Sequence, residues 1–203
     1  MSLEFPTQYE SQRLVLRSYR PGDGKWYYAM SLRNREHLMQ YESGNVAVNI
    51  TSEEAAEVLV QELAREWDKR TCFFIGAFDK KTGEFVAQIY VGPIDWSLPE
   101  FQIGYFVDVN HEGQGYVTEA VKATLRVLFT QLNAHRVGLA CDVTNLRSIR
   151  VAERCNMIRE GHLRENKRNP DDTYGSSLIY GLLKSEYETV CNSGREKIDQ
   201  VCD

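Results

Sequence analysis

The sequence predicts an α+β domain, in which a mixed sheet is flanked by helices. Strand patterns occur before, between and after helical patterns, and a strand–loop–helix–strand unit lies at the centre of the chain. No internal repeat or low-complexity tract divides the 203 residues. We therefore expect a single domain over residues 1–203, with its core at residues 10–188. The tail, residues 189–203, has little apolar content from Cys191 onward and is expected to be frayed or weakly helical.

The N-terminal half contains three strand patterns and two helical ones. Four of these five elements are strands at residues 13–17, 72–78 and 84–91 and a weakly periodic helix at residues 25–40. The last two of these strands are joined by a glycine-containing loop that suits a hairpin. A second helix begins at Thr51, because Thr51 and Glu54 have the spacing of a capping box. The apolar residues of this helix share one face: Ala56, Leu59, Val60, Leu63, Ala64 and Trp67.

The clearest strand pattern in the chain runs over residues 101–109. Its odd-numbered residues are apolar, and all but one of the residues between them are polar or glycine. A glycine-containing loop follows, and then a helix whose apolar face carries Val117, Ala120, Val121, Leu125, Leu128, Phe129 and Leu132. With the next strand, at residues 136–141, this unit forms a β–α–β crossover, so its strands should be parallel and the connection right-handed.

The last part of the chain adds one more helix and two more strands. The expected elements are a helix at residues 145–156 and strands at residues 157–164 and 174–183. The segment NKRNPDDT at residues 166–173 predicts a turn-rich loop between these strands.

Composition and charge narrow the class of protein. The chain is 42% hydrophobic and 26% charged, which is typical of a water-soluble globular protein. Its net charge is −5, so we expect no general nucleic-acid binding, which depends on a basic face. No run of about 18 apolar residues could span a bilayer, and MSLEFPTQYESQR lacks the apolar core of a secretion signal. We therefore expect a cytoplasmic protein without a membrane partner.

The cysteine and histidine residues indicate neither a disulfide framework nor a metal site. The cysteines are odd in number, widely spaced and without a C-x-x-C pair: Cys72, Cys141, Cys155, Cys191 and Cys202. The histidines lack the spacing of metal ligands: His37, His111, His135 and His162. We expect free thiols, histidines on the surface or in turns, and no bound metal.

The loop after the strand at residues 101–109 is the main candidate for a binding site. Gly113 and Gly115 permit a tight turn with no Cβ to obstruct a ligand. The amides of residues 113–118 then begin a helix, where unpaired N–H groups and the positive dipole end suit a phosphate or diphosphate. A turn that needs glycine and binds nothing explains the pattern equally well. Neither common nucleotide fingerprint is present, which disfavours kinases, NTPases and dehydrogenases.

Residues 103–120, IGYFVDVNHEGQGYVTEA, resemble the acyl-CoA-binding motif of the GNAT N-acetyltransferase superfamily. Three further stretches are similar to its branch of ribosomal-protein alanine/serine N-acetyltransferases, the RimJ/RimL type. They are ESQRLVLR at residues 10–17, NLRSIRVAERC at residues 145–155 and the strand at residues 174–183. The resemblance runs in order over most of residues 10–188.

The resemblance implies a GNAT-like acyl-CoA N-acyltransferase fold, with a mostly antiparallel sheet that splays between the strands at residues 101–109 and 136–141. Acetyl-CoA, the implied cosubstrate, would lie in that opening. Its pantetheine arm would pair with the backbone of residues 106–109, and its diphosphate would contact the amides of residues 113–118. The implied cofactor-binding residues are Phe106, Val107, Val109, Gly113, Gln114, Gly115, Tyr116, Val117, Thr118, Asn145 and Arg150. For Arg150, as for Arg147 and Arg154, a solvated helix face is the commoner explanation of the spacing.

The same resemblance implies a catalytic role for Ser148. Many members place a tyrosine later in the helix at residues 145–156 to protonate the departing thiolate, but the matching residue here is Ala152. In the ribosomal-protein branch, a serine at the position of Ser148 is the proposed acid. Asn145 resembles the residue that hydrogen-bonds the pantetheine arm, although a helix N-cap alone explains it. Members often carry glutamate at the position of Gln102. Glu100, two residues earlier, is therefore our candidate general base, with a solvated carboxylate as the alternative.

The expected function is acetyl transfer from acetyl-CoA to a primary amine, with a protein N-terminal α-amine as the preferred acceptor. One alternative is a small amine such as a polyamine, an aminoglycoside or an amino acid. The other is a non-catalytic acyl-CoA-binding module, suggested by Gln102 and by two departures in the loop. There, Glu112 replaces the usual Gln or Arg, and Val117 replaces the usual Gly or Ala. The sequence leaves the oligomeric state open, a homodimer included.

Overall fold

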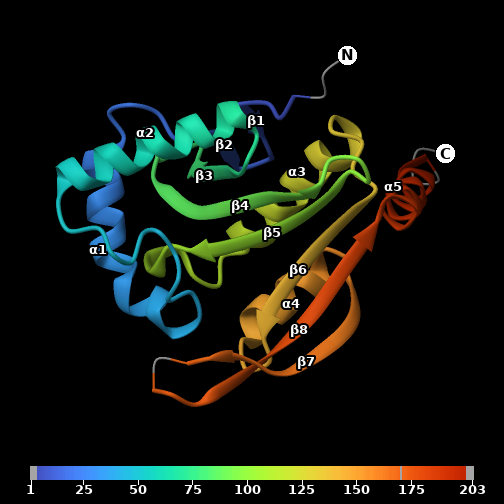
Figure 1. Ribbon diagram of the computed structural model, residues 1–203. Helices are drawn as coiled ribbons and strands as arrows, with labels where there is room; N and C mark the ends of the chain where they lie inside the picture. Colours follow the sequence, from blue (N-terminus) through green and yellow to red (C-terminus); the bar gives the residue numbers. More distant parts are fainter. Residues whose placement is uncertain (1–3, 170, 200–203) are drawn as a thin grey trace. The chain divides into compact units, whose positions relative to one another are not determined.

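The computed structural model describes residues 4–169 and 171–199. Its elements, drawn in Figure 1, are β1 (Gln8–Glu10), β2 (Leu14–Ser18), α1 (Gly24–Tyr41), α2 (Glu53–Lys69), β3 (Phe73–Asp79), β4 (Phe85–Asp95), β5 (Glu100–Val107), the 3-10 turn η1 (Val109–His111), α3 (Tyr116–Thr130), β6 (Arg136–Asp142), α4 (Leu146–Arg154), β7 (Ile158–Arg168), β8 (Tyr174–Leu183) and α5 (Lys184–Asp199). The strand order is β1-β2-β3-β4-β5-β6-β8-β7.

The sheet is mixed, as predicted. β5 and β6 pair in parallel, through Glu100–Gln102 and Arg136–Gly138. The pairs β1–β2, β2–β3, β3–β4, β6–β8 and β7–β8 are antiparallel. The predicted fold class and the parallel strands of the central crossover are therefore confirmed, and the right-handedness of the connection stays a prediction.

The chain folds into two compact units, which are described separately below. The N-terminal unit consists of Pro6–Pro93 and Ile103–Thr124. The C-terminal unit contains Ile94–Gln102 and the described residues from Leu125 onward, together with Glu4 and Phe5.

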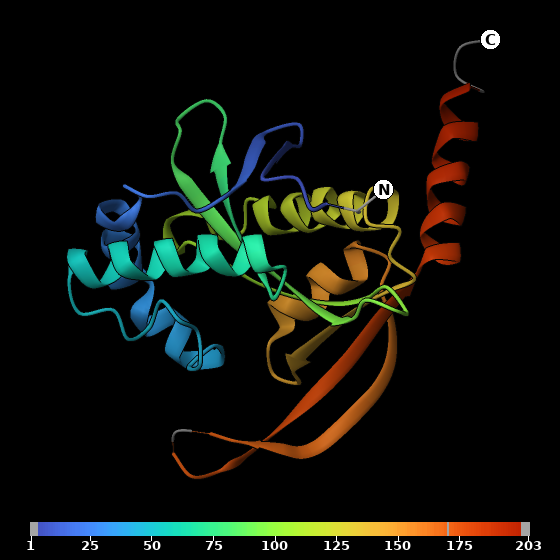
Figure 2. The same ribbon diagram turned by 45° about the horizontal axis from the view of Figure 1, so that its top comes forward.

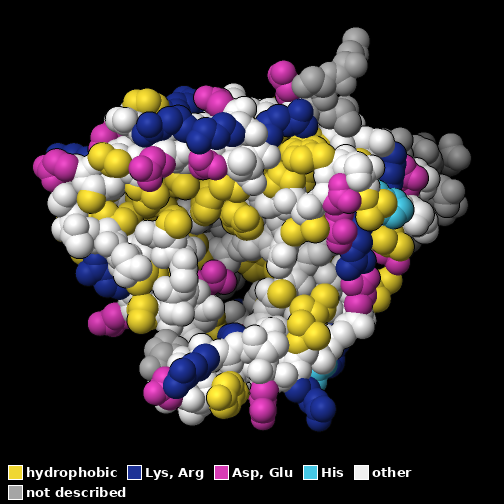
Figure 3. Space-filling view, in the orientation of Figure 1, with side chains coloured by type: hydrophobic (Ala, Val, Ile, Leu, Met, Phe, Trp, Pro, Cys, Tyr) yellow, Lys and Arg dark blue, Asp and Glu magenta, His cyan; other side chains and the backbone are white. Residues whose placement is uncertain are grey.

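Helices α1 and α2 cover the strands of the N-terminal unit. α2 packs against β3 and α1, and Figures 1 and 2 both show it lying over the strands of this unit. The helices and strands share one hydrophobic cluster that includes Tyr19, Tyr27, Met30, Leu38, Ala56, Val60, Leu63, Phe85 and Phe106. The outer face of α2 carries exposed charged side chains: Glu53, Glu54, Glu62, Arg65 and Lys69. Lys or Arg and Asp or Glu side chains gather along the upper edge of Figure 3. This separation confirms the amphipathic helix that the sequence predicts.

The start of α2 differs from the prediction by one residue. Ser52 is the N-cap, and its hydroxyl oxygen accepts a 3.1 Å hydrogen bond from the Ala55 N–H. Thr51 lies outside the helix, and its carbonyl oxygen accepts a 3.1 Å hydrogen bond from the Tyr28 hydroxyl. Both candidate residues carry a hydroxyl that can cap a helix, so the residue type alone does not choose between them.

The end of β5 is the second correction. The strand ends at Val107, and Val109 belongs to η1 instead of continuing the strand to residue 109. The reason is Asp108, whose side chain caps the turn by accepting a 3.0 Å hydrogen bond from the Asn110 N–H. An aspartate that caps its own turn favours departure from the strand.

The burial pattern of β5 also departs from simple alternation. Phe101 and Ile103 are buried, but the next buried residues are Phe106 and Asp108. The buried face therefore shifts by one residue within the strand. Phe106, the single exception to the alternating pattern in the sequence, marks this shift.

The C-terminal unit contains β6, β8 and β7, with α4 packed beside β6 (Figure 1). Asn156 follows α4 with φ = 58°, the left-handed conformation expected where a helix ends. β7 reaches Arg168, four residues beyond its predicted end, and α5 continues to Asp199. Residues 200–203 of the predicted tail lie outside the described residues, and the expected fraying stays a prediction. Within the described ranges, we find no helix with the length and apolarity needed to span a bilayer.

Candidate functional site

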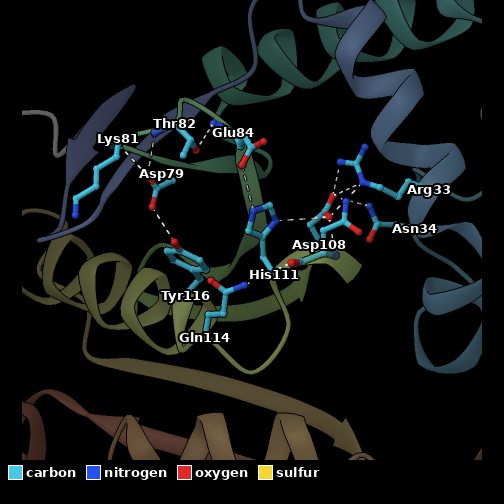
Figure 4. A network of polar contacts seen from close by, with 11 residues as sticks. Arg33, Asn34, Asp79, Lys81, Thr82, Glu84, Asp108, His111, Gln114 and Tyr116 are labelled. Carbon is cyan, nitrogen blue, oxygen red and sulfur yellow. Dashed lines mark hydrogen bonds and ion pairs between the residues drawn. The ribbon is translucent and has the colours of Figure 1, made fainter.

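Asp108 ties the end of β5 to α1 in the N-terminal unit (Figure 4). Its carboxylate is fully buried, and Oδ2 accepts hydrogen bonds from Arg33 Nη2 at 2.5 Å and from Asn34 Nδ2 at 3.0 Å. Asn34 Oδ1 in turn accepts a 2.9 Å hydrogen bond from the Val109 N–H. Burial would raise the pKa of Asp108, but its hydrogen bonds, led by those from Arg33, outweigh burial and hold the pKa below its ordinary value.

The loop between η1 and α3 adopts the conformation that its glycines permit. Gly113 has φ = 72° and Gly115 has φ = 78°, a region that costs other residues roughly 1–2 kcal/mol. The loop is exposed, and helical hydrogen bonding begins with the Glu119 N–H, which donates to the Gly115 carbonyl at 3.1 Å. The amides of Gly115, Tyr116 and Val117 precede that bond and have no acceptor within the helix. These donors, at the positive end of α3, fit the oxygen atoms of a diphosphate.

Side chains from two other elements hold the loop. Arg13 Nη2 donates to the Gln114 carbonyl oxygen at 3.2 Å, and Arg13 Nε donates to Glu119 Oε2 at 2.6 Å. The Tyr116 hydroxyl donates to Asp79 Oδ2 at 2.8 Å, as Figure 4 shows. The start of β2 and the β3–β4 hairpin are thereby joined to the first turn of α3.

His111 lies between two carboxylates in the same network (Figure 4). Its Nε2 is 3.5 Å from Glu84 Oε2, and its Nδ1 is 3.7 Å from Asp108 Oδ1. Nδ1 is buried and makes no hydrogen bond. The imidazole ring packs against Tyr116, with 5.9 Å between ring centres. His111 is therefore in a turn, as expected, but it is mostly buried and connects η1 to both the hairpin and α3.

Glu112, the acidic residue that departs from the family pattern, lies beside a histidine of α1. His37 Nδ1 is 3.4 Å from Glu112 Oε1. This contact places a group that can become positively charged next to the added negative charge. The charge of Glu112 is thus partly compensated from within the N-terminal unit when His37 is protonated.

A cavity of about 700 Å³ opens beside this network, within the N-terminal unit. Trp26, Phe78 and Phe85 form its aromatic wall, and Arg17 and Asp23 line it as well. The two charged residues are already paired, since Arg17 donates to both carboxylate oxygens of Asp23 at 2.7 and 3.0 Å. The Arg17 guanidinium also lies 4.4 Å from the centre of the Phe78 ring.

Helix α4 of the C-terminal unit carries the other predicted residues. Asn145 is its N-cap, and its Oδ1 accepts a 3.1 Å hydrogen bond from the Ser148 N–H. Burial raises the pKa of the Cys141 thiol, against the opposing effect of a hydrogen bond with the Ser148 hydroxyl. Ala152 is fully buried, and Arg150, like Arg147 and Arg154, is exposed on the helix surface.

Glu100, the candidate base, is the first residue of β5. Its Oε1 accepts a 3.1 Å hydrogen bond from Arg136 Nε, and Arg136 also forms an ion pair with Glu160. The carboxylate of Glu100 is therefore shared with a guanidinium in the C-terminal unit and is not a solitary solvated group.

The predicted residues fall into two groups, one in each unit. Phe106, Val107, Val109 and residues 113–118 lie together in the N-terminal unit, whereas Glu100, Asn145, Ser148 and Arg150 lie in the C-terminal unit. The sequence analysis missed the contacts that shape the loop, made by Asp108, Arg13 and Glu119. Arg13 and Glu119 belong to the motifs RLVLR and VTEA, but they are 106 residues apart in the sequence, and a contact over that separation leaves no local pattern.

Comparisons with known proteins identify the family of the chain. A family model described as "Acetyltransferase (GNAT) domain" matches residues 13–158. The ribosomal-protein-serine acetyltransferase of Escherichia coli (strain K12) is 27% identical over 173 residues, 85% of this chain and 94% of that protein. The spermidine N(1)-acetyltransferase of Vibrio cholerae serotype O1 is 26% identical over 155 residues, 76% of this chain and 84% of that protein.

A solved structure is similar over nearly the same length. It is that of RimL, a ribosomal L7/L12 α-N-protein acetyltransferase, in complex with coenzyme A. The match has a TM-score of 0.77 and 21% identity, and it covers 88% of this chain and 97% of that one. Because the family model spans most of the sequence, the chain belongs to the GNAT acetyltransferases, N-acetyltransferase enzymes for which acetyl-CoA is the typical donor.

Proposed function

We propose that this enzyme transfers an acetyl group from acetyl-CoA to the α-amine at the N-terminus of a protein, as the RimJ/RimL type does. The observation that carries the donor site is the exposed glycine loop, which leads into first-turn amides without helical acceptors. Main-chain donors bind phosphate whatever side chains they carry. The departures at Glu112 and Val117 therefore leave this part of the site able to bind.

In this proposal, the amides of residues 113–118 bind the diphosphate, and the backbone of β5 pairs with the pantetheine arm. The strand offers Phe106 and Val107 for such pairing. Val109 contributes less than its place in the motif implies, because it lies in η1 and its N–H already donates to Asn34.

Ser148 is the proposed acid, which donates its hydroxyl proton to the sulfur of the departing CoA. A thiol of pKa about 8.5 is a good leaving group. One hydrogen bond to the sulfur, followed by proton transfer as the C–S bond breaks, is therefore sufficient to assist its departure. Ala152 has no proton to give. Asn145 caps α4 with its side-chain oxygen Oδ1, which leaves its side-chain NH2 group able to donate to the pantetheine arm. Capping the helix and binding the arm are therefore compatible roles. Arg150, exposed on α4, is proposed to contact the nucleotide phosphates.

The acceptor follows from the chemistry of the attacking amine and from a relative. An α-amine has a pKa of about 7.7–8.0, so an appreciable fraction is neutral near pH 7, whereas a lysine amine near 10.4 is almost fully protonated. A base as weak as Glu100, already paired with Arg136, is adequate only for the former. The similarity to a ribosomal-protein-serine acetyltransferase supports the same acceptor class.

A polyamine is the second candidate acceptor. The similarity to a spermidine N(1)-acetyltransferase and the net charge of −5, which attracts cations, support it. The other small amines, an aminoglycoside or an amino acid, have no such support.

An acceptor screen distinguishes these alternatives. The purified chain is incubated with acetyl-CoA and, in separate wells, with N-terminal peptides beginning in serine or alanine, the same peptides with a blocked N-terminus, and spermidine. Released thiol and product mass are measured. We expect acetyl transfer only to the peptides with a free N-terminus. Transfer to spermidine alone would establish the second candidate, and transfer to blocked peptides would indicate lysine side chains.

A further inference from the structure

Arg13, just before β2, contacts the glycine loop with its side chain. Its Nη2 donates to the Gln114 carbonyl oxygen at 3.2 Å, and its Nε donates to Glu119 Oε2 at 2.6 Å. The same guanidinium lies 4.4 Å from the centre of the Tyr116 ring. One side chain therefore contacts the loop and the first turn of α3 together.

Glu119 holds the Arg13 side chain in this position. Its Oε1 accepts hydrogen bonds from the Ser11 hydroxyl at 2.6 Å and from the Arg13 N–H at 2.7 Å. Burial would raise the pKa of Glu119, but the hydrogen bonds from Ser11 and Arg13 outweigh burial and lower it. The carboxylate is thus ionised at neutral pH and fixed by three donors, and it fixes the guanidinium in turn.

The contact with Gln114 determines the direction of the next amide. The peptide bond between Gln114 and Gly115 is trans, so its N–H points opposite to its C=O. Since the carbonyl faces Arg13, the Gly115 N–H faces away from it. We infer that Arg13, oriented by Glu119, is a positioning residue that presets the Gly115 amide for the diphosphate of CoA. This inference rests on the proposed donor site.

The pair also balances charge near that site. Glu119 lies in the first turn of α3, where a carboxylate without a counterion would repel a bound anion. Arg13 neutralises it. The side chains are 41% and 19% exposed, respectively, so solvent screens the pair, and we expect its effect in ligand binding more than in folding stability.

A second ion pair near the β1–β2 turn provides a matched control. Lys80 Nζ lies 2.7 Å from Glu10 Oε2 and donates to the Ser11 carbonyl oxygen at 2.8 Å. Among the described residues, its side chain makes no hydrogen bond or ion pair with residues 112–115. Loss of this lysine removes a cation at a similar place in the sheet without touching the loop.

The test is calorimetric titration of the full chain with CoA and, separately, with pantetheine, which lacks the diphosphate. We expect R13M to weaken CoA binding about tenfold, as loss of a hydrogen-bonded charge does, and to leave pantetheine binding unchanged. In R13M/E119Q, removal of the unbalanced carboxylate should recover part of the CoA affinity, because Gln still accepts the Ser11 and main-chain hydrogen bonds. K80M should bind CoA like the wild type.

Three results would overturn the inference while leaving the proposed function intact: wild-type CoA affinity in R13M, an equal loss for pantetheine, or a further loss in the double variant. If R13M does not fold, R13K replaces it. A lysine cannot donate to Glu119 and Gln114 in this fork geometry, so weaker CoA binding is expected there too, and unchanged binding would contradict the inference. A wild-type chain that binds no CoA would instead refute the proposed donor site.

Discussion

The Tyr116 hydroxyl donates a 2.8 Å hydrogen bond to Asp79 Oδ2 and so connects the first residue of α3 to the last residue of β3. This bond lowers the pKa of Asp79 and raises the pKa of Tyr116. The other oxygen, Oδ1, accepts hydrogen bonds from the N–H groups of Lys81 and Thr82 at 2.8 and 3.1 Å. One carboxylate thus organises the hairpin turn and holds the start of the helix that follows the glycine loop.

The first prediction concerns this bond. Y116F keeps the ring that packs against Arg13 and His111 but removes the hydroxyl. We expect the melting temperature to fall by a few degrees and CoA to bind several-fold more weakly, because the first turn of α3 is released from the hairpin. Y174F is the matched control, since Tyr174 is largely exposed. Calorimetry that gives the same CoA affinity for both variants would show that this anchor does not act on the loop.

The second prediction uses the buried carboxylate of Asp108. D108A leaves Arg33 and Asn34 without their shared acceptor and removes the cap of η1, so we expect a loss of about 3 kcal/mol in the free energy of unfolding. D108N, which keeps one acceptor oxygen, should lose less. Urea unfolding at pH 7 measures both.

The pH dependence of D108N has a definite sign. The pKa of Asp108 is lowered in the folded state, so its ionised form contributes stability above the unfolded pKa, which is about 3.9. That contribution is lost as the pH falls below this value towards the folded pKa. The stability difference between wild type and D108N should therefore be constant from pH 5 to 7 and shrink on acidification below about pH 4. A difference that grows in acid would contradict the assigned direction.

The sequence predicts the elements well because their patterns are local. The apolar stripe of α2 depends on residues within a few positions of one another, and the structure has it. Two adjacent hydroxyl residues, Thr51 and Ser52, could each cap α2, so the sequence did not fix its first residue. The end of β5 was missed because Asp108 fits the alternating pattern of the strand and also caps the turn that follows it.

The candidate site was predictable only in part. The glycine loop is readable because positive φ angles select glycine locally. Its supports are not readable, since Arg13 and Glu119, or Arg33 and Asp108, are brought together only by the fold. The buried charge of Asp108 is not readable either, because in the sequence this residue falls on the polar side of the alternating pattern, although the fold buries it.

The third prediction tests the loop conformation. G115V places a β-branched residue at φ = 78°, next to Arg13, so we expect strain in the loop and CoA binding at least tenfold weaker. G83V is the control, because Gly83 has φ = 74° in the β3–β4 hairpin and no neighbour within 4 Å of an added Cβ. Both variants should be less stable, but only G115V should bind CoA poorly. Equal CoA affinities would show that the loop does not contact the ligand.

The fourth prediction concerns the acidic departure from the family pattern. E112Q removes a negative charge near the proposed diphosphate site, so we expect CoA to bind about two- to threefold more tightly at low salt. Because the group is partly exposed, the gain should fade at high ionic strength. E84Q removes a carboxylate that pairs with His111 instead, and it should leave CoA affinity nearly unchanged. Tighter binding in E84Q of the same size would mean that net charge alone is responsible.

The last prediction separates chemistry from structure at Ser148. The cap of α4 uses the main-chain N–H of Ser148, so S148A removes the hydroxyl and leaves the helix start intact. We expect kcat to fall about 100-fold at pH 7 with little change in the Kd for acetyl-CoA, since a positioned acid contributes about that much. The deficit should narrow above about pH 8.5, where a free thiol is itself ionised and needs no proton. S148T, which retains a hydroxyl, should keep much of the activity. A kcat for S148A that equals the wild type at pH 7, or a deficit that is the same at every pH, would remove Ser148 as the acid and leave it the structural contact with Cys141.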